Sequence, residues 1–234
     1  MSALALEKDL YSGSDPRDAP RYPCAQAAHY LFLPETTVAY WIRGGSYQGG
    51  YFQRVVDRPD PDDHRLSFWN LVELHIIKAL RRRHKIPMQS IRDSLVYAQQ
   101  EYGIERLLLD EGLRAAPGRV FFQRFGDLVN LGQDGQLAME EILTAYLDRL
   151  EWAKDGLVSR LFPATRDVVT ESPRIVVIDP GISFGRPIAD RCGVKTATFA
   201  ERFVAGESVR SLARDYDVRV SEVEEAIRYE RRAA

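Results

Sequence analysis

Two candidate helix-turn-helix motifs constrain the fold of this 234-residue chain, one at residues 22–43 and the other at residues 196–232. In the first motif, Leu33-Pro34-Glu35 separates two short segments with apolar residues at helical spacing. Proline fits the first turn of a helix, so a second helix is expected to open there. It is expected to end at Gly44-Gly45, because glycine readily leaves helical dihedral angles. The alternative interpretation is an ordinary helical hairpin.

The expected second helix has an apolar face formed by Val38, Trp41 and Ile42, and an opposite face with hydroxyls and an arginine. A glycine turn follows, flanked by aromatic and β-branched residues at 47–56, which predicts a two-stranded wing. A recognition helix followed by a wing can enter a DNA groove and contact phosphates. The predicted DNA-binding residues are Thr36, Thr37, Tyr40, Arg43, Tyr47, Gln48, Gln53 and Arg54.

Charge is unevenly distributed along the chain. Residues 40–92 contain ten Lys/Arg and five Asp/Glu, a surplus of five positive charges, whereas the whole chain has a net charge of −2. Amphipathic helices are expected at residues 66–84 and 86–103, and the first of them ends in a basic run at residues 81–85. That run suits contact with a DNA backbone, and a solvated helix end is the alternative.

The middle of the chain is expected to connect the two ends or to dimerise. Short β-like runs at residues 120–125 and 128–131 predict a hairpin, and a helix is expected at residues 136–156. Residues 101–171 hold eight basic and thirteen acidic residues, and this balance of −5 disfavours DNA contact. A linker is expected at residues 165–174.

The last part of the chain predicts a strand followed by a second three-helix motif. Residues 175–178 resemble a buried strand, and Ser221 with Glu224 forms a capping box that opens the final helix. Acidic side chains on that helix gain nothing from counterion release at phosphates, so a protein-binding or dimerising role is expected, with a second DNA reader as the alternative. The acidic residues are Glu222, Glu224, Glu225 and Glu230.

The stretches YPCAQAAHYLFLPETTVAYWIRGG and LSFWNLVELHIIKALRRRHKIPMQSIRDSL together resemble the DNA-binding half of MerR-type regulators. In that family a helix-turn-helix, a wing and a further helix pair form one unit. The recognition helix of the family usually has an arginine two residues after the threonine that matches Thr37, and this chain has Ala39 there. This departure leaves Thr36, Tyr40, Arg43 and the wing as the expected contacts.

The stretch IDPGISFGRPIADRCGVKTATFAERFVAGESVRSLARDYDVRVSEVEEAIRY resembles a bacterial helix-turn-helix antitoxin domain, long described as a domain of unknown function. Members of that family are encoded beside toxins with a PIN-like nuclease fold. The family tends to have Gly-Thr-Arg where this chain has Arg191-Cys192-Gly193. The matching residues are Gly185-Arg186-Pro187, Ala205-Gly206-Glu207-Ser208, Leu212, Asp215-Tyr216 and Ala226-Ile227-Arg228-Tyr229.

A MerR-like half followed by this domain is similar to the long VapB-type antitoxins of VapBC toxin-antitoxin systems. The elements and the resemblance together predict a mainly α-helical fold with small β-hairpins, in three parts. These are a MerR-like winged helix-turn-helix DNA-binding domain at residues 20–110, a connecting or dimerising hairpin and helix at residues 111–168, and a C-terminal three-helix antitoxin domain at residues 172–234.

The resemblance implies an antitoxin of a type II toxin-antitoxin system that neutralises a PIN-like VapC-type ribonuclease by direct binding. It also implies a homodimer that binds operator DNA and represses its own operon. Because PIN-like active sites hold Mg²⁺ with carboxylates, an arginine can compete there by a bidentate ion pair. The candidate toxin-binding residues are Arg186, Arg191, Arg231 and Arg232.

The alternative function is a MerR-like transcription regulator without a toxin partner, whose C-terminal domain binds a small ligand or serves dimerisation. No enzyme, metal site or cofactor is expected, because the four histidines fit no metal spacing and no phosphate-binding loop or nucleophile elbow is present. His75 falls on an apolar helix face and is expected to be a core residue. Without a signal-peptide pattern or an apolar run of about 18 residues, a soluble cytoplasmic protein is expected.

Overall fold

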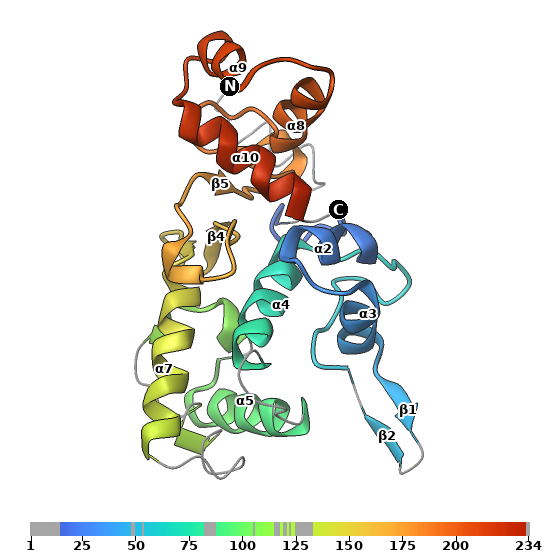
Figure 1. The fold of residues 1–234 in the computed structure, drawn as a ribbon. Helices are drawn as coiled ribbons and strands as arrows, with labels where there is room; N and C mark the ends of the chain where they lie inside the picture. The colour runs from blue at the N-terminus through green and yellow to red at the C-terminus, as the bar shows by residue number, and fades with distance from the viewer. Residues whose placement is uncertain are drawn as a thin grey trace.

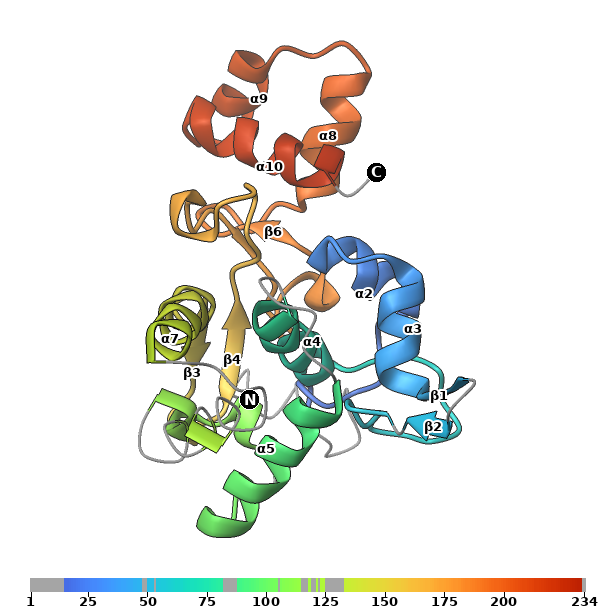
Figure 2. The same ribbon diagram turned by 60° about the horizontal axis from the view of Figure 1, so that its bottom comes forward.

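The described residues of the computed structural model are 15–47, 50–52, 54–81, 88–104, 106–114, 118, 121, 123–124 and 133–232. They form a mainly α-helical protein with small antiparallel hairpins, which confirms the predicted fold class. Figure 1 shows the C-terminal helices at one end of the molecule, above the N-terminal helices and the long helix of the middle segment. The C-terminal helices remain at one end when the molecule is turned (Figure 2), whereas the N-terminal and middle segments share one hydrophobic core.

The described elements are short, and their bounds define the labels used below. The helices are α2 (Cys24–Leu31), α3 (Glu35–Arg43), α4 (Phe68–Arg81), α5 (Met88–Tyr102), α7 (Gln133–Leu147), α8 (Thr196–Val204), α9 (Val209–Asp215) and α10 (Val220–Arg232). The strands are β1 (Gly45–Tyr47), β2 (Gly50–Phe52), β3 (Leu150–Trp152), β4 (Val158–Leu161), β5 (Val176–Val177) and β6 (Ile188–Ala189). Short 3-10 turns include η1 (Leu107–Leu109), η3 (Val169–Glu171) and η4 (Ser183–Gly185).

The first helix pair and its hairpin lie where the sequence predicts them. Helix α2 ends at Phe32, which adopts a left-handed conformation with φ 51°, and α3 follows two residues later. Strands β1 and β2 pair antiparallel, with Ser46 opposite Tyr51. The Val55 amide donates to the Trp41 carbonyl oxygen at 2.9 Å, so the returning strand is tied to α3. The backbone of a helix pair with a wing is therefore present.

Helix α4 is the centre of the larger hydrophobic core and is buried along most of its length. It packs against α2 on one side and α7 on the other. His75 is buried on α4, as predicted, and its Nε2 lies 3.2 Å from the Tyr146 carbonyl oxygen of α7. Burial lowers the pKa of His75 to about 3, so the ring is neutral at physiological pH.

The middle of the chain differs from its prediction. Residues 121, 123 and 124 are helical, so the hairpin predicted at 120–125 is wrong, and its second run at 128–131 lies outside the described residues. Phe121 is fully buried in the larger core. That burial outweighs the β preference of an aromatic run, because β preference depends strongly on context.

The helix predicted at 136–156 also ends early. Helix α7 stops at Leu147, and the chain then forms the β3–β4 hairpin, with Glu151 opposite Arg160. Asp155 accepts a hydrogen bond from the Leu157 amide at 3.0 Å, and Gly156 has a φ of +76°. An Asp-Gly pair supplies this turn at low cost, so it outweighs the helical spacing around it.

A buried arginine anchors the segment that was predicted as a linker at residues 165–174. Arg149 is 4% exposed, and its guanidinium donates to four backbone carbonyl oxygens. Burial, with Arg174 nearby, lowers the pKa of Arg149 to about 10, and the group stays charged at neutral pH. The acceptors are the carbonyl oxygens of Phe162 at 2.7 Å, Ser172 at 2.5 Å, Pro163 at 3.0 Å and Pro173 at 3.2 Å.

The C-terminal unit has its own small core. The strand predicted at 175–178 is confirmed as β5, which pairs antiparallel with β6. Helix α10 packs against both α8 and α9, and Phe199, Leu212 and Val223 meet between them. Within the described part of the chain, no helix has the length and apolar character needed to cross a membrane.

Candidate functional site

One face of α3 carries the predicted DNA-binding side chains. Thr36, Tyr40 and Arg43 are exposed and recur at helical spacing, so they share one face, while Thr37 is half-buried. Tyr40 is 46% exposed, although it belongs to a large aromatic type. The opposite face, Val38, Trp41 and Ile42, is buried against the rest of the unit, as predicted. This arrangement places hydroxyl and guanidinium groups on the outer face of α3.

The hairpin after α3 is described mainly by its backbone. Tyr47 lies in β1, but its side chain falls outside the described residues, as do Gln48 and Gln53 altogether. Arg54 is exposed and forms an ion pair with Asp57. The backbone alone therefore supports the wing, and of the predicted wing contacts only Arg54 has a described side chain.

A hollow of about 860 Å³ lies at the base of the hairpin, next to α5. Its arginines come from four places in the chain: the end of α3, the loop after the hairpin, α5 and the segment before η1. Arg43 and Arg54 were among the predicted contacts, and the others were not. The arginines that line the hollow are Arg43, Arg54, Arg58, Arg92 and Arg106.

Some of this positive charge is balanced within the hollow. Arg106 pairs with Glu73 and with Asp18, both at 3.1 Å. Burial raises the pKa of Glu73, although Arg106 opposes that shift. Arg58 and Arg92 belong to the net-basic stretch at residues 40–92. The charge of that stretch was the sequence feature that could have identified them as candidate contacts. Arg106 had no such signal, because its position depends on tertiary packing.

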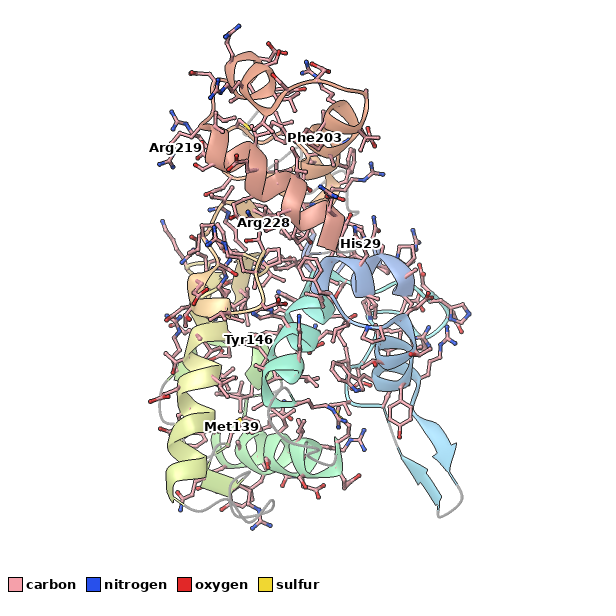
Figure 3. The ribbon with its side chains drawn as sticks, viewed as in Figure 1. His29, Met139, Tyr146, Phe203, Arg219 and Arg228 are labelled. Atoms are coloured by element: carbon pink, nitrogen blue, oxygen red, sulfur yellow. The ribbon has the colours of Figure 1, made fainter. Side chains whose placement is uncertain are left out.

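The prediction that α10 presents a row of glutamates is wrong. Glu222 is 4% exposed and Glu225 is 3% exposed, so neither forms an outer surface. Glu230 contacts Thr196 and lies 3.5 Å from His29 Nε2 of α2, which Figure 3 shows beside the C-terminal end of α10. Of the four predicted glutamates, only Glu224 is exposed.

Arginines hold the two buried glutamates in place. Glu225 pairs with Arg166 at 2.5 Å and also with Arg228. Burial disfavours the charged carboxylate, but polar contacts from Thr165, Arg166 and Arg228 outweigh this effect and lower the pKa of Glu225. Glu222 accepts from the Arg219 amide at 2.7 Å, which caps the start of α10. The acidic residues thus stabilise the unit from within.

The exposed side of α10 carries serine, glutamate and arginine side chains, and not the predicted row of glutamates. Ser221, Glu224, Arg228 and Arg231 recur at helical spacing and are exposed. Glu224, Arg228 and Arg231 of this stripe line a groove of about 810 Å³ between the three C-terminal helices and the segment at residues 165–167. The apolar side chains of this groove are Phe203, Val209 and Ile227. Most other residues of α10 are buried, so the helix has little free surface to insert into DNA.

The four predicted toxin-binding arginines do not form one cluster. Arg186 is exposed before β6, close to the Tyr30 hydroxyl. Arg191 is exposed near Glu222 at the start of α10, and Arg231 is exposed at the end of that helix. Helix α10 has 13 residues, so its two ends are roughly 18 Å apart at the rise of an α-helix. The Arg232 side chain lies outside the described residues.

The two helix-turn-helix units are in direct contact. The buried Tyr229 hydroxyl of α10 donates to the Tyr30 carbonyl oxygen of α2 at 2.9 Å, and its ring packs edge-on against Phe32 at 5.1 Å. The Tyr22 hydroxyl donates to the Gly185 carbonyl oxygen at 3.0 Å. The two units therefore share a buried contact surface.

A candidate metal centre is lacking among the residues that the structure describes, since no three or more His, Cys, Asp and Glu side chains gather there. Cys24 and Cys192 are both free thiols.

Comparison with known proteins relates both units to one group of proteins. A family model described as a protein of unknown function (DUF433) matches residues 176–229. A Mycobacterium tuberculosis protein named "Putative antitoxin VapB45" is 30% identical over 231 residues, which cover 90% of this chain and 93% of the relative. The crystal structure of Rv2018 from Mycobacterium tuberculosis matches with a TM-score of 0.66 and 27% identity, covering 90% of this chain and 98% of that one.

Proposed function

We propose that this chain, which belongs to the VapB-type antitoxin family, neutralises a PIN-like VapC-type ribonuclease and, as a homodimer, represses its own operon. One observation carries the antitoxin role: a relative named as an antitoxin matches almost the whole length of both chains. The finer roles rest on the two arginine-rich surfaces, which lie on different units. In this proposal the protein acts by binding, without catalysis of its own.

The DNA-binding role is assigned to the MerR-like N-terminal unit. An α-helix fits the major groove, and the exposed face of α3 offers Thr36, Tyr40 and Arg43 to base edges or phosphates. Arg54 and Arg92 near the base of the wing add positive charge on the same side of the unit. A dimer of such units would read two half-sites of an operator.

The toxin-binding role is assigned to the C-terminal unit. Helix α10 is mostly buried, which supports contact through the loops and edges of the unit in place of groove insertion. Exposed guanidinium groups can pair with carboxylates that would otherwise hold Mg²⁺ in a PIN-like site. Arg186, Arg191 and Arg231 are exposed, and their separation favours contact with an extended surface of the toxin.

A second candidate function follows from the groove along α10. Its apolar floor and arginine rim would also suit a small anionic ligand, as in a MerR-like regulator without a toxin partner. In that case the C-terminal unit would sense the ligand or serve dimerisation. Binding of the neighbouring gene product would argue against this alternative.

Replacing Arg186, Arg191, Arg231 and Arg232 together with alanine tests the toxin-binding role. We expect affinity for the co-expressed product of the adjacent gene to fall about tenfold or more, because charged pairs at an interface are costly to break. Titration calorimetry of the purified proteins measures this change.

The matched control replaces Arg210 and Arg214, two exposed arginines of α9, with alanine. This control also lowers the positive charge of the unit, and we expect its affinity to remain near that of the wild type. Unchanged binding of the four-arginine variant would remove these residues from the interface.

A further inference from the structure

A strained turn precedes the C-terminal helices. Ser183, Phe184 and Gly185 of η4 are three consecutive residues in the left-handed region, with φ values of 50°, 56° and 68°. Glycine adopts this conformation freely, whereas other L-residues meet steric resistance from their Cβ atoms. The first two positions are therefore unfavourable for the residues that occupy them.

The N-terminal unit holds this turn in its shape. The Tyr22 hydroxyl donates to the Gly185 carbonyl oxygen, and the Arg21 guanidinium donates to the Pro180 carbonyl oxygen at 2.8 Å. A Cβ atom at Gly185 would lie 2.0 Å from the Tyr22 hydroxyl oxygen. The close approach requires glycine at this position and fixes the turn against a neighbouring unit.

The turn displays apolar surface and one cation. Phe184 is 77% exposed and Ile182 is 42% exposed, and Arg186 is exposed directly after the turn. A turn that only linked β5 to β6 would be less strained with glycine or asparagine at position 184. It would also avoid leaving a phenyl ring in water. Strain and exposed aromatic surface at one position point to binding.

We propose that Phe184, flanked by Ile182 and Arg186, is the anchor with which the C-terminal unit docks its protein partner. The partner surface that fits is an apolar pocket for a phenyl ring, with a carboxylate at its edge for Arg186. A rigid aromatic side chain is an effective anchor because little conformational entropy is lost on binding. This inference rests on the proposed function, in which the partner is the toxin.

A second copy of this chain fits the turn less well. The apolar groove along α10 could receive Phe184, but its charged residues are Arg166, Arg228 and Arg231 with Asp167 and Glu224, so the groove offers Arg186 no net acidic surface. Such a contact would also join two different surfaces, and it would not close into a two-fold dimer. Both arguments favour a different protein as the occupant.

Replacing Phe184 with asparagine tests the inference. Asparagine tolerates the left-handed conformation, so we expect the thermal unfolding temperature of the variant to be equal to or above that of the wild type. Affinity for the co-expressed product of the neighbouring gene is expected to fall about thirtyfold, as for an interface hot spot. Phe184→Tyr, which keeps the ring, is expected to retain most of the affinity.

The matched control is Val204→Asn, which removes an apolar side chain that is 83% exposed at the end of α8. We expect this variant to bind like the wild type. Equal binding by Phe184→Asn and wild type would overturn the anchor while leaving the proposed function intact. Failure of the wild type to bind the neighbouring product would overturn the proposed function itself.

Two further results would also overturn the assignment. One is a lower unfolding temperature of Phe184→Asn that accounts for its weaker binding, since the side chain would then be structural. The other is dissociation of a wild-type oligomer by Phe184→Asn in the absence of the partner, measured by light scattering. That result would make the turn a contact between copies of this chain.

Discussion

Replacing Arg149 with methionine is expected to lower the free energy of unfolding by about 3 kcal/mol or more. The side chain is buried and donates to four backbone carbonyl oxygens, and hydrogen bonds from a charged donor contribute roughly 1.5–3 kcal/mol each before the cost of burying the charge is subtracted. Methionine fills similar space but leaves those acceptors without their donor. Chemical denaturation followed by circular dichroism measures the change.

Two further variants distinguish this role from a general effect of charge. Arg149→Lys keeps the charge but loses the planar fork, so we expect an intermediate loss of stability. Arg65→Ala removes an arginine that is 55% exposed and pairs with Asp63, and we expect little or no loss of stability because solvent screens exposed ion pairs. A loss below about 1 kcal/mol for Arg149→Met would contradict the anchoring role, given the typical worth of buried hydrogen bonds.

Replacing Tyr40 and Arg43 together with alanine is expected to weaken binding to the DNA upstream of the protein's own gene by about tenfold to a hundredfold. Both side chains project from the exposed face of α3, where they can reach a groove without disturbing the buried face. Loss of one phosphate contact is also expected to reduce the slope of log affinity against log salt by about 1. Fluorescence anisotropy at several salt concentrations measures both quantities.

The control for this experiment is the Arg210→Ala and Arg214→Ala double variant, which removes two exposed charges from the C-terminal unit. Its affinity for the same DNA is expected to match that of the wild type. If the α3 variant keeps the wild-type affinity and salt slope, α3 is not the recognition helix. If the control weakens binding equally, the affinity for DNA depends on the overall charge of the protein and not on the exposed face of α3.

The local sequence pattern predicts helix α3 well, because proline and glycine mark its ends. Helix α3 was expected from its apolar spacing between Pro34 and Gly44, and its observed bounds agree. The run around 120–125 also has boundary residues, Pro117-Gly118 before it and Gly126-Asp127 after it, yet residues 121, 123 and 124 are helical and Phe121 is buried in the larger core. Boundary residues therefore marked the ends of this segment without deciding between helix and strand.

Contacts between side chains that are far apart in the sequence cannot be predicted from local residue spacing. The charged residues of α10 could be counted from the sequence. Whether Glu225 faces inward or outward depends on Arg166, which lies 59 residues before it. The strained turn at Phe184 depends in the same way on Tyr22, 163 residues before Gly185. The packing of the two units explains the shape of this turn.

The most direct test of the account is a ribonuclease assay with the purified product of the adjacent gene. Adding this chain is expected to inhibit RNA cleavage in proportion to its amount and to reach full inhibition at a fixed stoichiometry, with a stable complex in size-exclusion chromatography. Inhibition should weaken in the Phe184→Asn variant and persist in Val204→Asn. Undiminished cleavage in the presence of excess wild-type chain, with no complex formed, would contradict the proposed antitoxin function.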